Sequence, residues 1–504
     1  MTMKNILQYL EAAEKRFPEK TAFADESESV SFTALAELSR RGGSRLISKG
    51  LYNEPVAVFM KKAPQVICAF FAVIYAGCYY VPLDPGMPKH RIRMILDRLR
   101  PSAVVCDDAC EKLLCDLGHG DAMLPVSELF SAEEDKAALE SVRRRSIDTD
   151  PIYIVFTSGS TGMPKGVTAC HRSLIDYAEA LCPVIGARED SVFGMQVPLY
   201  VDACMKEILS VIRCGSSAYL MPQSIFMFPV KAIEYLNKYR INTVCWVASA
   251  LTMISGLGGF EEMMPQYLRT VCFGSEVFPV KQLRAWKNAC PKAEFINLYG
   301  PTEATGMSFY YRVEERFFDE SADPGPVPIG RPFENTGYLL LKEGDVPAAP
   351  GEQGELCIRG TALTLGYFDD PERTAAAFTQ NPLNPHYPER IYRTGDLAVE
   401  TESGDLVFVS RKDNQIKNMG HRIELGEIES CACMFSGVES ACCIFVKETS
   451  KLYLYYMGTA DEKSLQRYMR SELPRHMLPS KLIKLETLPL LPNGKIDRNK
   501  LLEM

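Results

Sequence analysis

A loop dense in glycine, hydroxyl and lysine residues follows a short β-rich run, Ile152 to Phe156. The loop reads Thr157-Ser158-Gly159-Ser160-Thr161-Gly162-Met163-Pro164-Lys165-Gly166. Glycine lets backbone N–H groups approach phosphate oxygens, and hydroxyls and lysine add donors and charge, so this composition suits a nucleotide polyphosphate. The spacing is not that of a Walker A loop, in which a lysine directly follows the second glycine. The alternative interpretation is a flexible surface loop.

Three further segments combine tight turns with charged or aromatic side chains. They are Asn297-Leu298-Tyr299-Gly300-Pro301-Thr302-Glu303, Tyr392-Arg393-Thr394-Gly395-Asp396-Leu397 and Pro492-Asn493-Gly494-Lys495-Ile496-Asp497-Arg498. Each is a weak signal alone, because turns of this composition are usually structural. The combination and its order along the chain are far more specific.

Length and composition exclude several classes of protein. A chain of 504 residues exceeds the usual limit of one hydrophobic core, so we expect two or more domains. A net charge of −8 argues against general nucleic-acid binding. The first residues lack the apolar stretch of a signal peptide, and no apolar run reaches the length of a membrane span. The 17 cysteines lack metal-ligand spacing, which favours free thiols in a reducing cytoplasm.

The apolar pattern predicts an α/β fold. Strand-like runs at 56–60, 79–83 and 103–105 alternate with helical runs at 63–76 and 91–98. The same rhythm resumes further along, so we predict two subdomains of βαβ type with mostly parallel sheets.

The pattern of apolar and turn-forming residues changes near Gly330. Short strands separated by Gly, Pro and Asp predict a small, barrel-like antiparallel subdomain, and a compact α+β domain ends the chain. We therefore place a core domain at 1–411 and a mobile C-terminal lid domain at 412–504. The charged junction Ser410-Arg411-Lys412-Asp413-Asn414 suits an exposed hinge.

Taken together, these motifs resemble the adenylate-forming superfamily of acyl-CoA synthetases, non-ribosomal peptide synthetase adenylation domains and luciferase-like enzymes. The resemblance covers nearly the whole chain. Within the superfamily, Tyr80-Val81-Pro82-Leu83-Asp84 and the stretch from His421 to Glu429 look like amino-acid adenylation domains. The chain also has the size of stand-alone D-alanine–carrier protein ligases.

The resemblance implies two half-reactions. The carboxylate of an amino acid attacks the α-phosphorus of ATP, giving aminoacyl-AMP and pyrophosphate. The phosphopantetheine thiol of a carrier protein then attacks the acyl carbon and releases AMP. No carrier domain follows in this sequence, so we expect the carrier to be a separate protein.

The resemblance also implies roles for individual residues. Glu303 would coordinate Mg²⁺, Lys165 and Lys495 would be catalytic, and Asp413 would be the hinge. Lys495 would bridge the substrate carboxylate and the α-phosphate, and it would matter more for adenylation than for thioester formation. The remaining nucleotide-binding residues would be Thr157, Ser158, Gly159, Ser160, Thr161 and Gly162 at the phosphates, Gly274, Ser275, Asn297 and Tyr299 around adenine, and Asp396 and Arg411 at the ribose. Gly300 and Thr302 would also bind the nucleotide.

The amino acid would be recognised through Asp202, because a carboxylate at this position pairs with the substrate α-ammonium. The alternative interpretation of Asp202 is a helix N-cap. By the same alignment the side-chain pocket would be lined by Ala203, Lys206, Ser249, Val271, Phe273, Leu298, Gly306 and Met307. Lys206 suits an acidic substrate if it points inward, because a buried ammonium needs a partner. It could instead extend to solvent or pair with Glu207 or another protein carboxylate.

Two aspects stay open at this stage. The bulky Phe273, Leu298 and Met307 would suit a small substrate such as D-alanine, although this chain has Gly274-Ser275-Glu276 where those ligases commonly have Cys-Gly-Glu, so that cysteine is lost. The competing classes are an acyl- or aryl-CoA ligase that uses free CoA, and a catalytically silent scaffold that retains the adenylation fold.

Overall fold

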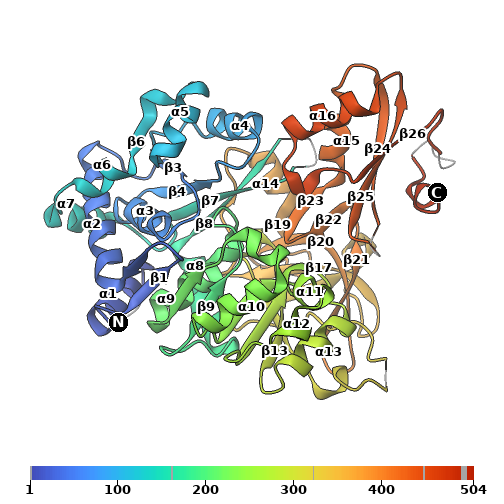
Figure 1. Ribbon diagram of the computed structural model, residues 1–504, viewed down its shortest axis with the longest axis horizontal. Coiled ribbons are helices and arrows are strands. Elements are labelled where there is room, and N and C mark those ends of the chain that lie inside the picture. The colour runs from blue at the N-terminus through green and yellow to red at the C-terminus, as the bar shows by residue number, and fades with distance from the viewer. Residues whose placement is uncertain (1–2, 160–162, 322, 447–448, 490–495) are drawn as a thin grey trace. The chain divides into compact units, whose positions relative to one another are not determined.

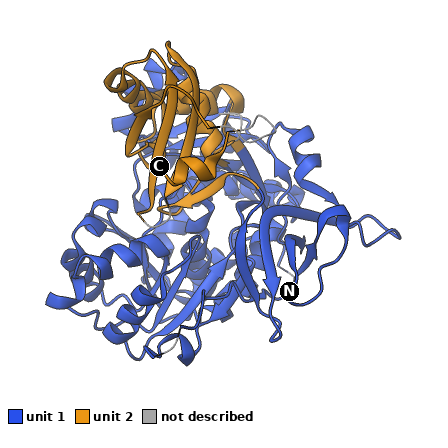
Figure 2. Ribbon diagram, turned by 90° about the vertical axis from the view of Figure 1, so that its right-hand side faces the viewer, with its two compact units in different colours: residues 1–85, 101–155, 166–412 blue, residues 86–100, 156–165, 413–504 orange. Residues whose placement is uncertain are grey.

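The computed structural model describes residues 3–159, 163–321, 323–446, 449–489 and 496–504. The chain separates into two compact units, which Figure 2 colours blue and orange. The first unit comprises residues 1–85, 101–155 and 166–412, and the second comprises 86–100, 156–165 and 413–504. The second unit therefore contains everything after Lys412 together with two short segments from earlier in the chain.

One sheet of the first unit has nine strands among the described residues, several of which are labelled in Figure 1. Its order is β15 (Arg331–Pro332), β14 (Phe309–Arg312), β13 (Glu294–Tyr299), β12 (Thr270–Gly274), β11 (Thr243–Val247), β9 (Val192–Met195), β10 (Ser217–Leu220), β1 (Thr21–Ala24), β2 (Ser29–Ser31). From β13 to β1 every neighbouring pair is parallel, and the edge strands pair antiparallel. The carboxyl ends of β9, β11, β12 and β13 therefore meet at one edge, where ligands bind in open α/β sheets.

A second sheet has seven strands within the described part of the chain. Its order is β18 (Gly366–Tyr367), β8 (Lys165–Cys170), β7 (Pro151–Thr157), β4 (Tyr79–Leu83), β3 (Pro55–Phe59), β5 (Ala103–Cys106), β6 (Met123–Pro125). The pairs from β7 through β4 and β3 to β6 are parallel. The two sheets confirm the predicted α/β fold class.

Helices form the connections, as parallel strands require. In the first unit they are α1 (Leu7–Arg16), α2 (Phe32–Ser48), α3 (Pro64–Tyr75), α5 (Asp108–Asp116), α6 (Val126–Ser131), α7 (Lys136–Arg145), α8 (His171–Val184), α9 (Met205–Cys214), α10 (Pro229–Lys238), α11 (Ala248–Gly256), α12 (Gly259–Glu262), α13 (Val280–Ala289) and α14 (Pro371–Ala377). α3 starts with proline at its first position, and all of its residues except Gln65 are buried. α2 packs so closely on α3 that a Cβ at Gly42 would lie 2.7 Å from the Cβ of Ala72.

The third sheet of the first unit is antiparallel. Its strands are β16 (Thr336–Leu341), β17 (Gln353–Gly360), β20 (Arg390–Glu400) and β19 (Phe378–Gln380), and β21 (Leu406–Arg411) also pairs with β20. It lies where the sequence predicts an antiparallel subdomain, and its closure into a barrel stays a prediction.

The second unit has its own core. Its elements are α4 (Lys89–Leu99), β22 (Gln415–Asn418), β23 (His421–Glu424), α15 (Leu425–Cys433), β24 (Val438–Val446), β25 (Lys451–Gly458), α16 (Glu462–Glu472), β26 (Lys481–Lys484) and α17 (Arg498–Leu502). β24, β25 and β26 form one sheet, and β22 and β23 form a hairpin. Apolar residues of α15, α16, β24 and β25 pack into one cluster, which includes Ile428, Leu454 and Leu465.

Two chain-wide observations complete the description. No helix in the described ranges combines the length and apolar character needed to cross a bilayer. All 17 cysteines are free thiols, and most of them are buried.

Candidate active site

Three predicted nucleotide residues form one buried cluster at the end of β13. The hydroxyl of Tyr299 donates to the Asp396 carboxylate, and the Arg411 guanidinium donates to the other carboxylate oxygen. Asp396 on β20 lies directly opposite Arg411 on β21 in the sheet register. Burial, with help from the neighbouring Asp396 charge, raises the pKa of Tyr299 well above its usual value. The cluster therefore presents a neutral phenol beside a carboxylate whose charge is held by Arg411.

Glu303 is fully buried and held by a tyrosine that the sequence analysis did not single out. It lies in the short 3-10 helix η4 (Thr302–Ala304), directly after β13. The Tyr367 hydroxyl donates to Glu303 Oε1 at 2.8 Å, and the Thr364 amide donates to the Glu303 carbonyl at 3.0 Å. The next residue, Phe368, donates its amide to the carbonyl of Gly166, which directly follows Lys165. The segment from Thr364 to Phe368 therefore links Glu303 to the start of β8.

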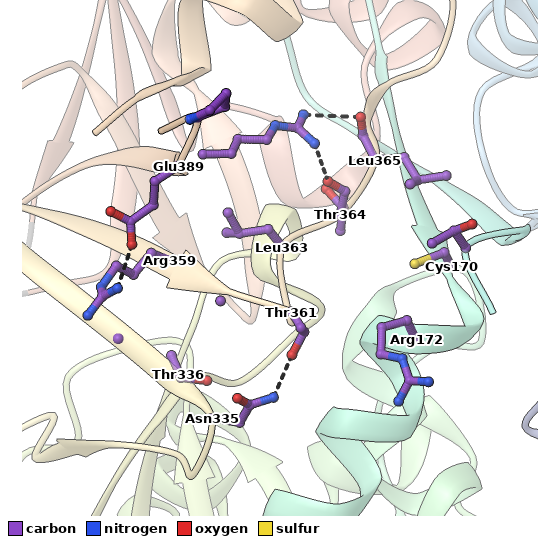
Figure 3. A pocket seen from close by; sticks show the side chains of 15 residues that line it. Cys170, Arg172, Asn335, Thr336, Arg359, Thr361, Leu363, Thr364, Leu365 and Glu389 are labelled. Carbon is purple, nitrogen blue, oxygen red and sulfur yellow. Dashed lines mark hydrogen bonds and ion pairs between the residues drawn. The ribbon is translucent and has the colours of Figure 1, made fainter. Parts of the chain in front are cut away.

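A cavity of about 680 Å³ is lined in part by Thr364 and Leu365 at the start of this segment. Figure 3 shows residues that line it, and none of them is a predicted site residue. The guanidinium of Arg390 donates to the carbonyls of Thr364 at 3.2 Å and Leu365 at 3.1 Å, bonds that are dashed in Figure 3. Arg390 thus supports the segment that carries Tyr367.

The glycine- and hydroxyl-rich loop joins β7 to β8. Ser158 is buried and donates to the Arg422 carbonyl at 2.7 Å, and Lys165 is also buried. The Thr157 hydroxyl is buried and lacks a hydrogen-bond partner among the described atoms. An unsatisfied hydroxyl at the start of the loop fits a site for an absent polar ligand. Three predicted phosphate-binding residues, Ser160, Thr161 and Gly162, lie outside the described residues.

Asp202 lies beside two buried tyrosines. It starts the 3-10 helix η2 (Asp202–Cys204), which leads into α9. The hydroxyls of Tyr153 on β7 and Tyr177 on α8 have no hydrogen-bond partner in the described structure. Burial, followed by the Asp202 charge, raises the pKa of both. A Cβ at Gly306, whose φ is +87°, would lie 3.3 Å from the Tyr177 hydroxyl, so Tyr177 borders a predicted pocket residue.

Lys206 and Glu207 at the start of α9 are buried, and the charge of the half-buried Lys62 acts on Glu207. Lys206 is only 3% exposed, which excludes its extension to solvent. Among the described residues no carboxylate lies within ion-pairing distance of its ammonium. Glu207 is fully buried, and neither of its carboxylate oxygens has a hydrogen-bond partner in the part of the chain described. Burial raises the pKa of Glu207 to about 7, although Lys206 and Lys62 both oppose that rise.

Most of the other predicted pocket residues lie at or just after the carboxyl ends of the parallel strands of the large sheet, whereas Val271 lies near the start of β12. These other residues are Ala203 in η2, Ser249 in α11, Val271 and Phe273 in β12, Leu298 in β13, and Met307 after η4. The Ser249 amide donates to Glu276 at 3.0 Å. Gly274 lies opposite Leu298, and a Cβ there would lie 2.1 Å from the Leu298 carbonyl oxygen. Gly274 is therefore required by close strand packing, whatever ligand binds.

The remaining predicted nucleotide residues lie close by in the chain. Asn297 on β13 donates its side-chain amide to the Pro328 carbonyl at 2.7 Å. Ser275 has a φ of +66°, and a Cβ at Gly300 would lie 2.1 Å from the Gly306 carbonyl oxygen. Thr302 opens η4, next to Glu303.

In the second unit, Asp413 accepts a hydrogen bond from the Gln415 amide at 3.1 Å. Lys495 lies outside the described residues. Arg91 of α4 forms an ion pair with Glu427 at 2.6 Å, and the rings of His421 and His476 stack at 3.7 Å. Burial lowers the pKa of His421 to about 4 and that of His476 to about 2, so the stacked pair is neutral at physiological pH.

Sequence reasoning missed Tyr367, Tyr177, Tyr153 and Lys62. None of them lies in a segment that reads as a chemical motif, because each is an ordinary residue of a strand, a helix or a loop. Glu207 was noted only as a possible partner of Lys206, although its own burial is the more unusual feature.

Comparisons with known proteins identify the family of this chain. A family described as AMP-binding enzyme matches residues 10–368. Tyrocidine synthase 1 of Brevibacillus parabrevis is 30% identical over 99% of this chain, which spans 45% of that synthase. The L-proline–[L-prolyl-carrier protein] ligase of Streptomyces coelicolor is 31% identical over 93% of the chain and 90% of that ligase.

Among solved structures, an NRPS protein that contains adenylation and PCP domains superposes with a TM-score of 0.84. It is 23% identical, and the match covers 99% of this chain and 84% of that one. At this identity the likeness concerns the fold alone.

Proposed function

This chain belongs to the AMP-binding enzyme family, and from that premise we propose that it activates an amino acid as aminoacyl-AMP and transfers it to a carrier-protein thiol. The observation that carries the proposal is the match along almost the whole length of a relative named for ligating an amino acid to its carrier protein. ATP is the second substrate, and pyrophosphate and AMP are the products. Free cysteine thiols favour a cytoplasmic location.

In the first half-reaction the substrate carboxylate attacks the α-phosphorus of ATP. Both partners are anionic, so the chain must supply positive charge and align them. Lys165 and the hydroxyls of Thr157 and Ser158 would bind the β- and γ-phosphates, together with residues 160–162. Lys495 would stabilise the charge that develops between carboxylate and phosphate.

The nucleoside would bind at the cluster at the end of β13. Asp396 would accept hydrogen bonds from the ribose hydroxyls, and Arg411 would orient its carboxylate. The ring of Tyr299 would stack on adenine, because its hydroxyl is already held by Asp396.

Glu303 fits a Mg²⁺ site. Mg²⁺ takes one or two protein carboxylates and fills its other positions with phosphate and water oxygens, so a cluster of protein ligands is unnecessary. The described residues contain no group of three metal-ligating side chains, which agrees with such a sparse site. Bound Mg²⁺ would neutralise phosphate charge, while Tyr367 would orient the Glu303 carboxylate.

Asp202 would pair with the substrate α-ammonium, with Tyr153 and Tyr177 beside it. The charges around it favour an acidic side chain on the substrate. Lys206 is buried, and burial raises the pKa of the neighbouring Glu207 to about 7, so Glu207 offsets the Lys206 charge only in part near neutral pH. A substrate side-chain carboxylate close to Lys206 would pair with its ammonium, because buried charges are stable only when they are paired.

The test is pyrophosphate release with hydroxylamine trapping across L- and D-amino acids and simple aliphatic and aryl acids. We expect glutamate or aspartate to exceed all other substrates. D-alanine as the best substrate would mean that Lys206 faces away from the ligand. Turnover only with acids that lack an α-amino group would refute amino-acid activation and favour an acyl- or aryl-CoA ligase.

The acceptor separates the two ligase classes. With the adenylated substrate formed, we expect a phosphopantetheinylated carrier protein to be loaded much faster than free CoA. If no acid yields an adenylate, the remaining interpretation is a catalytically silent scaffold with the adenylation fold.

A further inference from the structure

Lys62 links the seven-stranded sheet of the first unit to its nine-stranded sheet through its ammonium. It lies in the loop between β3 and α3 of the seven-stranded sheet. Its Nζ donates to the carbonyls of Met195 at 3.0 Å, Gln196 at 3.2 Å and Met221 at 3.1 Å. Met195 ends β9, and Met221 directly follows β10, so these acceptors belong to neighbouring strands of the nine-stranded sheet.

The three carbonyls use the whole donor capacity of Lys62, because an ammonium group has three N–H bonds. Lys62 also lines a cavity of about 500 Å³, together with Gln196 and Tyr200. Since none of its hydrogens is left over, Lys62 is not a binding site for an anion in that cavity. Its ammonium instead forms hydrogen bonds to the backbone.

The backbone that Lys62 binds at Gln196 continues to Asp202. Gln196 is followed by a short segment in which Val197 and Leu199 are buried. The Leu199 carbonyl accepts from Cys204 Sγ at 3.7 Å, and the Val201 carbonyl accepts from the Cys204 amide at 3.2 Å. The segment is thus held at its start by the ammonium and at its end by η2, with Asp202 at that second anchor.

The charges around Lys62 favour its protonated form. Burial lowers the pKa of Lys62 to about 8, and the groups that oppose this are Glu207 on α9 and Cys204 in η2. The fully buried Glu207 carboxylate has no hydrogen-bond partner in the described chain, and its charge favours the protonated form of Lys62. The Lys62 side chain is half-buried, and its three acceptors would each lose a bond on its removal.

We propose that Lys62 is a positioning residue for substrate recognition, which fixes the carbonyl ends of β9 and β10 so that the segment from Gln196 to Asp202 presents its carboxylate to the amino acid. The inference rests on the proposed function, because it assigns Asp202 to the substrate ammonium. It predicts an effect on amino-acid binding and none on ATP binding, since the Tyr299, Asp396 and Glu303 contacts do not involve these strands.

The experiment compares Lys62→Met, Lys62→Gln and Lys62→Arg in ATP–pyrophosphate exchange, with KM measured separately for the amino acid and for ATP. We expect the amino-acid KM of Lys62→Met to rise at least about tenfold, since the acceptors are left unsatisfied. Lys62→Gln, which retains two N–H donors, should lie between wild type and Lys62→Met, and the ATP KM should stay within about twofold. The matched control is Lys61→Met, because the Lys61 side chain is exposed and does not bind these backbone carbonyls.

The outcomes separate the two proposals. A wild-type protein that exchanges no pyrophosphate with any amino acid refutes the proposed function. An active wild type with an unchanged amino-acid KM in Lys62→Met refutes the positioning role, as does an equal rise in both KM values. If Lys62→Met does not fold, the decision falls to Lys62→Arg. The longer, planar guanidinium of Arg does not reproduce the three bonds of the ammonium, so the amino-acid KM of this variant should rise while its ATP KM stays within about twofold, and an unchanged amino-acid KM refutes the role.

Discussion

Removing one hydroxyl, in Tyr367→Phe, should weaken nucleotide activation without disturbing the pocket for the amino acid. The Tyr367 hydroxyl donates to Glu303 at 2.8 Å, and both side chains are buried. Hydrogen bonds to charged groups contribute about 1.5–3 kcal/mol, and the ring itself stays in place against Phe378. If that energy is expressed in Mg²⁺-dependent activation, kcat/KM for ATP should fall between about 10-fold and 150-fold.

The assay is ATP–pyrophosphate exchange at saturating amino acid, with ATP and Mg²⁺ varied in turn. The matched control is Tyr387→Phe, because Tyr387 is 63% exposed and lies away from Glu303. A double-mutant cycle with Glu303→Gln isolates the pair, since the Tyr367 effect should shrink to near zero once the carboxylate is gone.

Two results would refute this reasoning. One is a Tyr367→Phe protein with kcat/KM for ATP within about twofold of wild type, which would mean that Glu303 does not depend on the hydroxyl. The other is a full effect that persists in the Glu303→Gln background, which would place the role of Tyr367 elsewhere.

Three other changes test separate parts of the site. Asp202→Asn should lower kcat/KM for the amino acid at least about 100-fold and spare acids without an α-amino group, because it removes the charge that pairs with the ammonium; equal losses for both substrate types would contradict this. Lys495→Ala should abolish most adenylate formation, yet a protein supplied with preformed aminoacyl-AMP should still load the carrier, and undiminished adenylation would refute the mechanism. Burial raises the pKa of Glu207 from 4.5 to about 7. Between these two pH values the folded protein keeps a proton on Glu207 that the unfolded chain releases. The contribution of Glu207 to folding stability therefore falls as the pH rises from 4.5 to 7. Glu207→Gln should remove that component, so urea unfolding should show the variant gaining up to about 3 kcal/mol on wild type between pH 4.5 and 7.5; a constant difference would refute the shift.

The sequence alone was sufficient for the architecture and for the motifs. Strands such as Tyr79–Leu83 and Thr336–Leu341 end where the apolar pattern predicts, because alternation of buried runs with Gly, Pro and Asp is a local property. The roles of Asp396 and Glu303 stay predictions, and the structure corrects one detail, because Asp396 lies inside β20 and not in a turn. Lys495 and residues 160–162 remain predictions.

Tertiary structure was needed wherever a residue acts through partners distant in sequence. Tyr367 reaches Glu303 across 64 positions of the chain, and Lys62 reaches Met195 across 133, so no local pattern could identify either. The same holds for Lys206, since its sequence allows an exposed ammonium as well as a buried one. Only the packing of α9 in the core decided between them, because burial depends on which elements surround a side chain and not on its neighbours along the chain.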